Sequence, residues 1–145
     1  MTLYSLRERF LKLALEADAD GEVLKTLMAG MKTFNNAAVQ SLNSHKIVAT
    51  VRDDEAQIVA GVIGGLAGDS MYLEVVWTAS SARGKGFGRK LMQMAETEAK
   101  RLGAREVWLY TMSFQAKPFY EKLGYHQFAE LKWLDGARHF MRKDL

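Results

Sequence analysis

The sequence contains no cysteine and only one proline, Pro118, among its 145 residues. The lack of cysteine excludes disulfide bonds and cysteine-based zinc sites. No stretch approaches the roughly 18 consecutive apolar residues of a membrane-spanning helix. Residues 1–10 carry Arg7, Glu8 and Arg9 where a signal peptide would need an apolar run. Together these features predict a soluble cytoplasmic protein.

Positive charge is in small excess, with a formal net charge of +3. A mildly basic chain suits an anionic small ligand as well as nucleic acid, so the charge favours neither. The length fits one domain with a single core, and no linker or repeat marks a boundary; we therefore expect a single domain over residues 1–145. The three histidines, His45, His126 and His139, stand far apart, and we predict no metal site.

The spacing of apolar residues changes along the chain. It is typical of helices in the first third, and segments typical of strands and of helices both occur in the rest. Helices are expected at residues 5–17, 21–31, 36–43, 89–102 and 115–123. Strands are expected at residues 46–52, 57–66, 71–78, 106–112, 125–131 and 139–142. Gly64 and Gly65 inside the second strand suggest a β-bulge. This order implies an α/β domain of the α+β type with a mixed, largely antiparallel sheet.

A glycine-rich run, S-S-A-R-G-K-G-F-G at residues 80–88, joins the third strand to the strongest helix. Glycine has no Cβ, so a ligand can approach its backbone closely. The first N–H groups of a helix are unpaired and lie at the positive end of its dipole, which favours anions and typically phosphate. Arg83, Lys85, Arg89 and Lys90 add positive charge. The simpler alternative is a glycine-rich turn that only caps the helix.

Two well-known phosphate-binding loops do not fit this run. The P-loop requires G-x-x-x-x-G-K-[ST], but Gly86 follows the G-K pair and Ala79 stands at the first glycine position. The dinucleotide fingerprint G-x-G-x-x-G would need its third glycine at Arg89 or at Leu91. A nucleoside triphosphate or dinucleotide site of either type is therefore not predicted.

The pattern that does fit is R-x-x-G-x-G, formed by Arg83, Gly86 and Gly88. It resembles the pyrophosphate-binding motif of the GNAT superfamily of N-acetyltransferases. A second signature of that superfamily, A-x-x-F-Y-x-x-x-G-Y, is matched downstream by Ala116, Phe119, Tyr120, Gly124 and Tyr125. Two signatures in order are more specific than either alone, and the resemblance covers about residues 72–143. The run S-F-Q-A at residues 113–116 is similar to that of a subgroup of small bacterial members.

The resemblance implies the GNAT fold, a mixed and mostly antiparallel sheet of about six to seven strands flanked by helices, with strands four and five splayed apart. It also implies an acetyl-CoA-dependent N-acetyltransferase that moves the acetyl group directly to a primary amine of a small molecule or protein. No metal is expected. A small-molecule amine is the expected partner, with no nucleic acid and no membrane, and a homodimer is an analogy from the family.

The same resemblance assigns the residues that would hold acetyl-CoA. The pyrophosphate would lie against the loop and helix start, formed by Arg83, Gly84, Lys85, Gly86, Phe87, Gly88 and Arg89. The backbone of Val76, Trp77 and Thr78 would pair with the pantetheine arm. Ser113 stands where many members carry an asparagine that contacts the coenzyme, and Gln115 is an alternative for that contact.

Two residues are candidates for proton transfer. Tyr120 aligns with the family's general acid and would protonate the departing thiolate. Alternatively it is a core aromatic residue whose hydroxyl only makes a structural hydrogen bond. Glu74 is the only acid inside the third predicted strand, and burial would raise its pKa towards that of a general base. Alternatively Glu74 binds a cationic substrate or pairs with an arginine, and water acts as the base. Trp133 lines the substrate mouth or is a core or rim aromatic.

Two other classes of function stay open at this point. The fold could serve as a binding module that senses acetyl-CoA without transferring the acetyl group. The basic loop could bind nucleic acid, although no stripe of basic and aromatic residues supports this. The presence of Tyr120 favours the enzyme.

Overall fold

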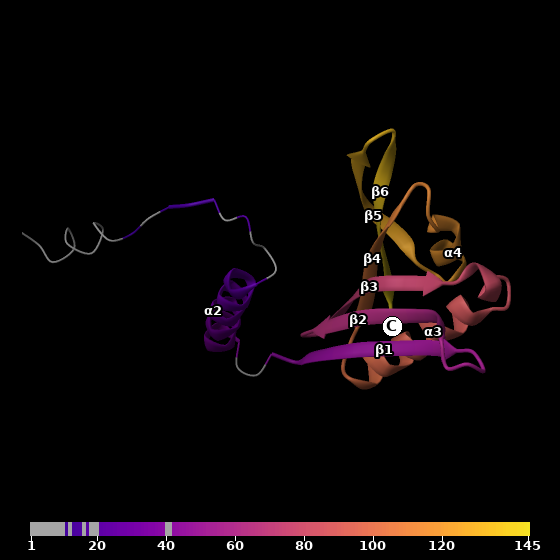
Figure 1. The fold of residues 1–145 in the computed structure, drawn as a ribbon, viewed down its shortest axis with the longest axis horizontal. Coiled ribbons are helices and arrows are strands. Elements are labelled where there is room, and N and C mark those ends of the chain that lie inside the picture. Colours follow the sequence, from indigo (N-terminus) through magenta and orange to yellow (C-terminus); the bar gives the residue numbers. More distant parts are fainter. Residues whose placement is uncertain (1–10, 12, 16, 18–20, 40–41) are drawn as a thin grey trace, which may run out of the picture. The chain divides into compact units, whose positions relative to one another are not determined.

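The computed structural model describes residues 11, 13–15, 17, 21–39 and 42–145, and the chain divides into two compact units, 1–41 and 42–145. In the first unit, helix α2 runs from Glu22 to Ala38 (Figure 1). It confirms the helix predicted at 21–31 and extends it into the region predicted as a separate turn at 36–43, of which residues 40–41 lie outside the described residues. The helix predicted at 5–17 falls largely outside them as well, and residues 11, 13–15 and 17 are not helical.

The second unit is built on one six-stranded sheet with the order β1-β2-β3-β4-β6-β5 (Figure 1). Its strands are β1 (Ser44–Arg52), β2 (Ile58–Ala67), β3 (Ser70–Thr78), β4 (Glu106–Met112), β5 (His126–Trp133) and β6 (Gly136–Asp144). Only β3 and β4 pair in parallel; the other neighbours are antiparallel. The predicted mixed, mostly antiparallel sheet is therefore confirmed.

A bulge lies opposite Gly64, but its extra residue is on β3 and not inside the second strand as predicted. Ile63 pairs with Val75 and Gly64 pairs with Leu73, so Glu74 is the extra residue on β3. A bulge of this kind re-aims the side chain of the unpaired residue and bends the strand. Glycine at position 64 fits because an added Cβ would lie only 3.1 Å from the Met71 sulfur.

The last strand is longer than its sequence indicated. Strand β6 begins at Gly136, directly after a two-residue turn in which Leu134 has a φ of 49° and Trp133 pairs with Gly136. The predicted strand at residues 139–142 was too short because the rest of β6 lacks the alternation of apolar and polar residues that marks a strand. Strand β6 lies between β4 and β5, so backbone pairing on both sides defines its length.

Two helices accompany the sheet. Helix α3 (Phe87–Arg101) packs against β1, β2 and β3 and buries a stripe formed by Leu91, Met92, Ala95 and Ala99. Burial of each large side chain in such a stripe contributes about 2 kcal/mol. Helix α4 (Lys117–Lys122) carries Pro118 in its first turn, where the missing N–H costs little. No helix among the described residues is long and apolar enough to cross a membrane.

Candidate active site

Strands β3 and β4 are joined only at their beginning. Their pairing is limited to Ser70 with Glu106, Met71 with Val107 and Tyr72 with Trp108. Beyond these pairs β4 continues along β6 and β3 continues along β2, so the two strands separate. This confirms the expected splay, which involves the third and fourth strands of the described part of this chain.

A cleft of about 980 Å³ occupies the gap between the separated strands. Its walls come from β3, the glycine-rich loop, the start of α3, β4 and α4. The lining residues are 72–78, 82–84, 86–89, 109–111, 114–116, 119 and 120. The cleft therefore brings together all of the predicted site residues except Lys85 and Ser113.

The glycine-rich loop forms one end of the cleft and presents unpaired backbone donors. Gly84 and Gly86 have φ values of 74° and 79°, which only glycine adopts without strain. The first intrahelical bond runs from Lys90 N to Gly86 O at 3.2 Å. Within the described part of the chain, the six N–H groups of residues 84–89 donate to no backbone carbonyl. Consecutive free N–H groups at a helix start form an anion-binding site.

Gly88 opens the cleft behind these donors. An added Cβ would lie 3.3 Å from Phe119 Cζ and 4.0 Å from Thr78 Oγ1. The side chain of Arg83 fixes the loop from the other side, because its Nε donates to Thr78 O at 3.1 Å. Lys85 is exposed and does not line the cleft.

Tyr120 is buried in α4 and its side chain lines the cleft. Its ring makes edge-on contacts with Phe119 and Tyr125, with centroid distances of 5.1 and 5.9 Å. Burial raises the pKa of Tyr120 to about 12. The phenol is therefore protonated at neutral pH and available as a donor. Full proton transfer to a thiolate requires that the sulfur be desolvated too, since burial also raises a thiol pKa.

Glu74 lines the cleft but is not buried. Its side chain is 39% exposed, and Oε1 lies 2.5 Å from Lys46 Nζ of β1. The expectation that this carboxylate is buried is therefore not met. The physical reason is the bulge, which directs this side chain across Gly65 of β2, whose added Cβ would lie 3.4 Å from Oε1.

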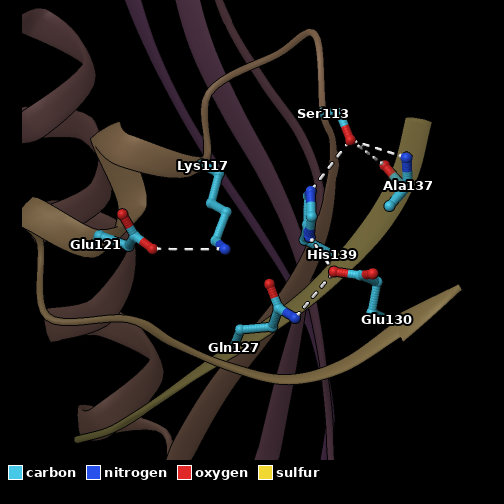
Figure 2. A network of polar contacts seen from close by, with 7 residues as sticks. All are labelled: Ser113, Lys117, Glu121, Gln127, Glu130, Ala137 and His139. Atoms are coloured by element: carbon cyan, nitrogen blue, oxygen red, sulfur yellow. Dashed lines mark hydrogen bonds and ion pairs between the residues drawn. The ribbon is translucent and has the colours of Figure 1, made fainter. Parts of the chain in front are cut away.

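Ser113 points away from the cleft, towards β6. Its hydroxyl lies 3.1 Å from Ala137 O, accepts from Ala137 N at 2.8 Å and lies 3.2 Å from Nε2 of His139 (Figure 2). His139 in turn lies 3.2 Å from a Glu130 carboxylate oxygen through Nδ1. Ser113 thus belongs to a network of β4, β5 and β6. Gln115 does line the cleft, and its Oε1 accepts from Met112 N at 2.7 Å.

The residues that sequence reasoning missed are aromatic. Tyr72 and Tyr110 line the cleft from β3 and β4, with ring centroids 6.5 Å apart. Burial is the largest of the effects that raise the pKa of Tyr72. Tyr72 is the last residue of β3 that pairs with β4, so it lies where the two strands begin to separate. Trp133 is not a lining residue, but its ring lies 6.0 Å from that of Phe114, which is one.

Comparison with known proteins agrees with this geometry. The Acetyltransferase (GNAT) family matches residues 10–125. The chain belongs to this GNAT acetyltransferase family. It is therefore an N-acetyltransferase of the EC 2.3.1 type, and members of the GNAT family use acetyl-CoA as co-substrate.

Individual relatives are acetyltransferases too. An acetyltransferase of Agrobacterium fabrum is 27% identical over 113 residues, covering 78% of this chain and 82% of the relative. The blasticidin-S acetyltransferase of Streptomyces morookaense is 28% identical over 103 residues, covering 70% of this chain and 76% of that relative. A solved acetyltransferase structure from Agrobacterium tumefaciens superposes with a TM-score of 0.86 at 25% identity, covering 93% of this GNAT chain and all of that one.

Proposed function

We propose that this GNAT protein binds acetyl-CoA in the cleft between β3 and β4 and transfers the acetyl group to a primary amine of a small molecule. The observation that carries the proposal is the row of six unpaired N–H groups of residues 84–89 at one end of that cleft. A pyrophosphate has the charge and size that such a row of donors binds. Arg83 and Arg89, which also line the cleft, add positive charge at the same end.

The remaining residues of the cleft fit the rest of the coenzyme. Gly88 leaves free the space that a side chain would fill next to Phe119. The backbone of Val76, Trp77 and Thr78 has no partner on β4 and can pair with an amide-containing pantetheine arm. The match of the family to residues 10–125 spans both units, which supports one acetyltransferase domain over residues 1–145.

The proposed chemistry is direct transfer. Bound acetyl-CoA supplies a thioester whose carbonyl carbon accepts the amine and whose sulfur departs. A backbone N–H of β3 near Trp77 or Thr78 donates to the carbonyl oxygen as it gains negative charge. A C–N bond forms and the C–S bond breaks. Glu74 or a water accepts the proton that the attacking ammonium must lose, and Tyr120 donates a proton to the sulfur. The nitrogen loses a second proton as the amide forms, and this proton restores the Tyr120 hydroxyl.

A small molecule is the acceptor class that the relatives favour. The blasticidin-S acetyltransferase of Streptomyces morookaense, which shares 28% identity over 103 residues, is named for a small-molecule substrate. Away from the glycine-rich loop, the cleft is lined by side chains of β3 and β4, including Tyr72, Glu74 and Tyr110. We take this part of the cleft as the acceptor end. Such a surface suits a compact amine.

Calorimetric titration with acetyl-CoA tests the proposal. The wild type is expected to bind, and Gly86→Glu is expected to abolish binding by placing negative charge and backbone strain in the anion-binding loop. Gly103→Glu is the matched control, because Gly103 also has a positive φ, 99°, but follows α3 at its other end. Absence of binding by the wild type, or equal loss in both variants, contradicts the assignment of the loop. Release of free thiol with a panel of primary amines then tests transfer.

A further inference from the structure

Arg138 of β6 lies over the ring of Tyr110, a lining residue of the cleft, and has no ion-pair partner among the described residues. None of the ion pairs or side-chain hydrogen bonds found among residues 21–39 and 42–145 includes it. Its Nε is buried and has no hydrogen-bond acceptor. A buried polar group left unpaired is uncommon and calls for a ligand, an ion or a water.

The position of Arg138 is set by aromatic and apolar neighbours. Its guanidinium carbon lies 4.8 Å from the centre of the Tyr110 ring. In the sheet its backbone pairs with Met112 of β4 and with Leu131 of β5, neither of which offers a carboxylate. Stacking on Tyr110 holds the guanidinium plane in place, so less conformational entropy is lost when a ligand binds.

This cation lies beside the end of the cleft that the acceptor must use. If the coenzyme pyrophosphate occupies the loop at residues 84–89, the amine can reach the thioester only from the opposite end. Tyr72 and Tyr110 line the cleft near the point where β3 and β4 begin to separate, and the guanidinium of Arg138 lies over the Tyr110 ring. A carboxylate bound by Arg138 beside Tyr110 would thus lie at the same end of the cleft as the reacting amine.

The charges at this end favour an anion. Of the described residues that line the cleft, only Glu74 is acidic, and its carboxylate is already paired with Lys46. No carboxylate in residues 21–39 and 42–145 pairs with the guanidinium of Arg138 in this way. An acceptor that carries a carboxylate would supply one, because arginine binds carboxylates through two parallel hydrogen bonds.

We propose that Arg138 binds a carboxylate of the acceptor, so that the substrate class is a primary amine that also carries a carboxylate, as amino acids do. This inference rests on the proposed function, since it concerns the second substrate of the same cleft. Arg138 is a specificity-determining residue in this scheme, while proton transfer stays with Tyr120 and with Glu74 or water.

Acetylation of matched amine pairs tests the proposal. L-phenylalanine and phenethylamine, or L-leucine and isoamylamine, differ only in the carboxylate. The wild type is expected to prefer the carboxylated member by roughly tenfold or more in kcat/KM, the factor expected for charge-assisted hydrogen bonds. Arg138→Met should reduce the ratio to about one, and Arg138→Lys should restore part of it. Arg101→Met, on the α3 surface where Arg101 pairs with Glu98, is the control and should leave the ratio unchanged.

A binding measurement keeps the inference testable if none of these amines is acetylated. The 15N resonance of Arg138 Nε, assigned by its loss in Arg138→Met, should shift on titration with 3-phenylpropionate and not with 3-phenylpropanol. Wild-type preference for the decarboxylated amines, a ratio unaffected by Arg138→Met, or no shift with 3-phenylpropionate overturns the proposal. Calorimetry with acetyl-CoA on the same samples separates this outcome from failure of the proposed function, because Arg138→Met should bind acetyl-CoA as the wild type does.

Discussion

The hydroxyl of Ser113 lies 3.2 Å from Nε2 of His139, across the junction of β4 and β6. The same hydroxyl accepts from the N–H of Ala137 at 2.8 Å and lies 3.1 Å from its carbonyl oxygen. Ser113 therefore fastens the end of β4 to the start of β6, and this occupies the hydrogen-bonding capacity that a coenzyme contact would need.

Ser113→Ala should consequently lower stability without affecting coenzyme binding. Loss of the hydroxyl removes its hydrogen bonds to Ala137, and we expect the free energy of unfolding to fall by about 1 kcal/mol. The dissociation constant for acetyl-CoA should stay within twofold of the wild type. Denaturant unfolding and calorimetry measure the two quantities. Ser44→Ala is the control, since Ser44 makes no side-chain hydrogen bond within the described residues and should leave both unchanged. A tenfold weaker affinity of Ser113→Ala for acetyl-CoA would contradict this and show that Ser113 contacts the coenzyme.

Gly88→Ala should show the opposite behaviour. The added Cβ would lie 3.3 Å from Phe119 Cζ and occupy space at the cleft. We expect affinity for acetyl-CoA to fall at least tenfold, while stability is maintained because alanine favours a helix by up to about 1 kcal/mol over glycine. Gly30→Ala in α2 is a matched control, because nothing lies within 4 Å of its added Cβ. Unchanged affinity in Gly88→Ala would show that the coenzyme does not approach this position.

Glu74→Gln tests which group accepts the ammonium proton. Among the described residues Glu74 is the only acidic one that lines the cleft, so its replacement should lower kcat/KM at least tenfold. Binding of acetyl-CoA should be unaffected. Glu98→Gln, which alters a carboxylate paired with Arg101 on the surface of α3, serves as the control. A kcat/KM unchanged by Glu74→Gln would leave water as the base.

The features that local sequence determines could be predicted. Gly84, Gly86 and Gly88 mark the anion-binding loop by their own conformational freedom, and Leu91 and Ala95 mark the buried face of α3 by helical spacing. The splay of β3 from β4 followed from the resemblance to the GNAT family rather than from any single residue.

Contacts between distant segments could not be predicted. Glu74 was expected to be buried, but a bulge and a lysine 28 residues away hold it at the surface. Ser113 was expected at the coenzyme, but Ala137, 24 residues away, holds its hydroxyl. Nothing in the local pattern around either residue encodes these partners, because register in a sheet depends on strands that are remote in sequence.

Tyr120 makes stability depend on pH in the alkaline range. Burial raises its pKa to about 12, whereas a tyrosine of the unfolded chain titrates near 10. Between these values the unfolded chain has lost a proton that the folded protein retains. The contribution of Tyr120 to stability is therefore fully present below about pH 10 and is lost as the pH rises towards 12. From pH 9 to pH 11 the wild type should lose roughly 1 kcal/mol more unfolding free energy than Tyr120→Phe, measured by denaturant unfolding. Equal losses in both proteins would mean that the Tyr120 hydroxyl is solvated in the folded state, and a solvated hydroxyl would not fit a general acid in a water-excluding site.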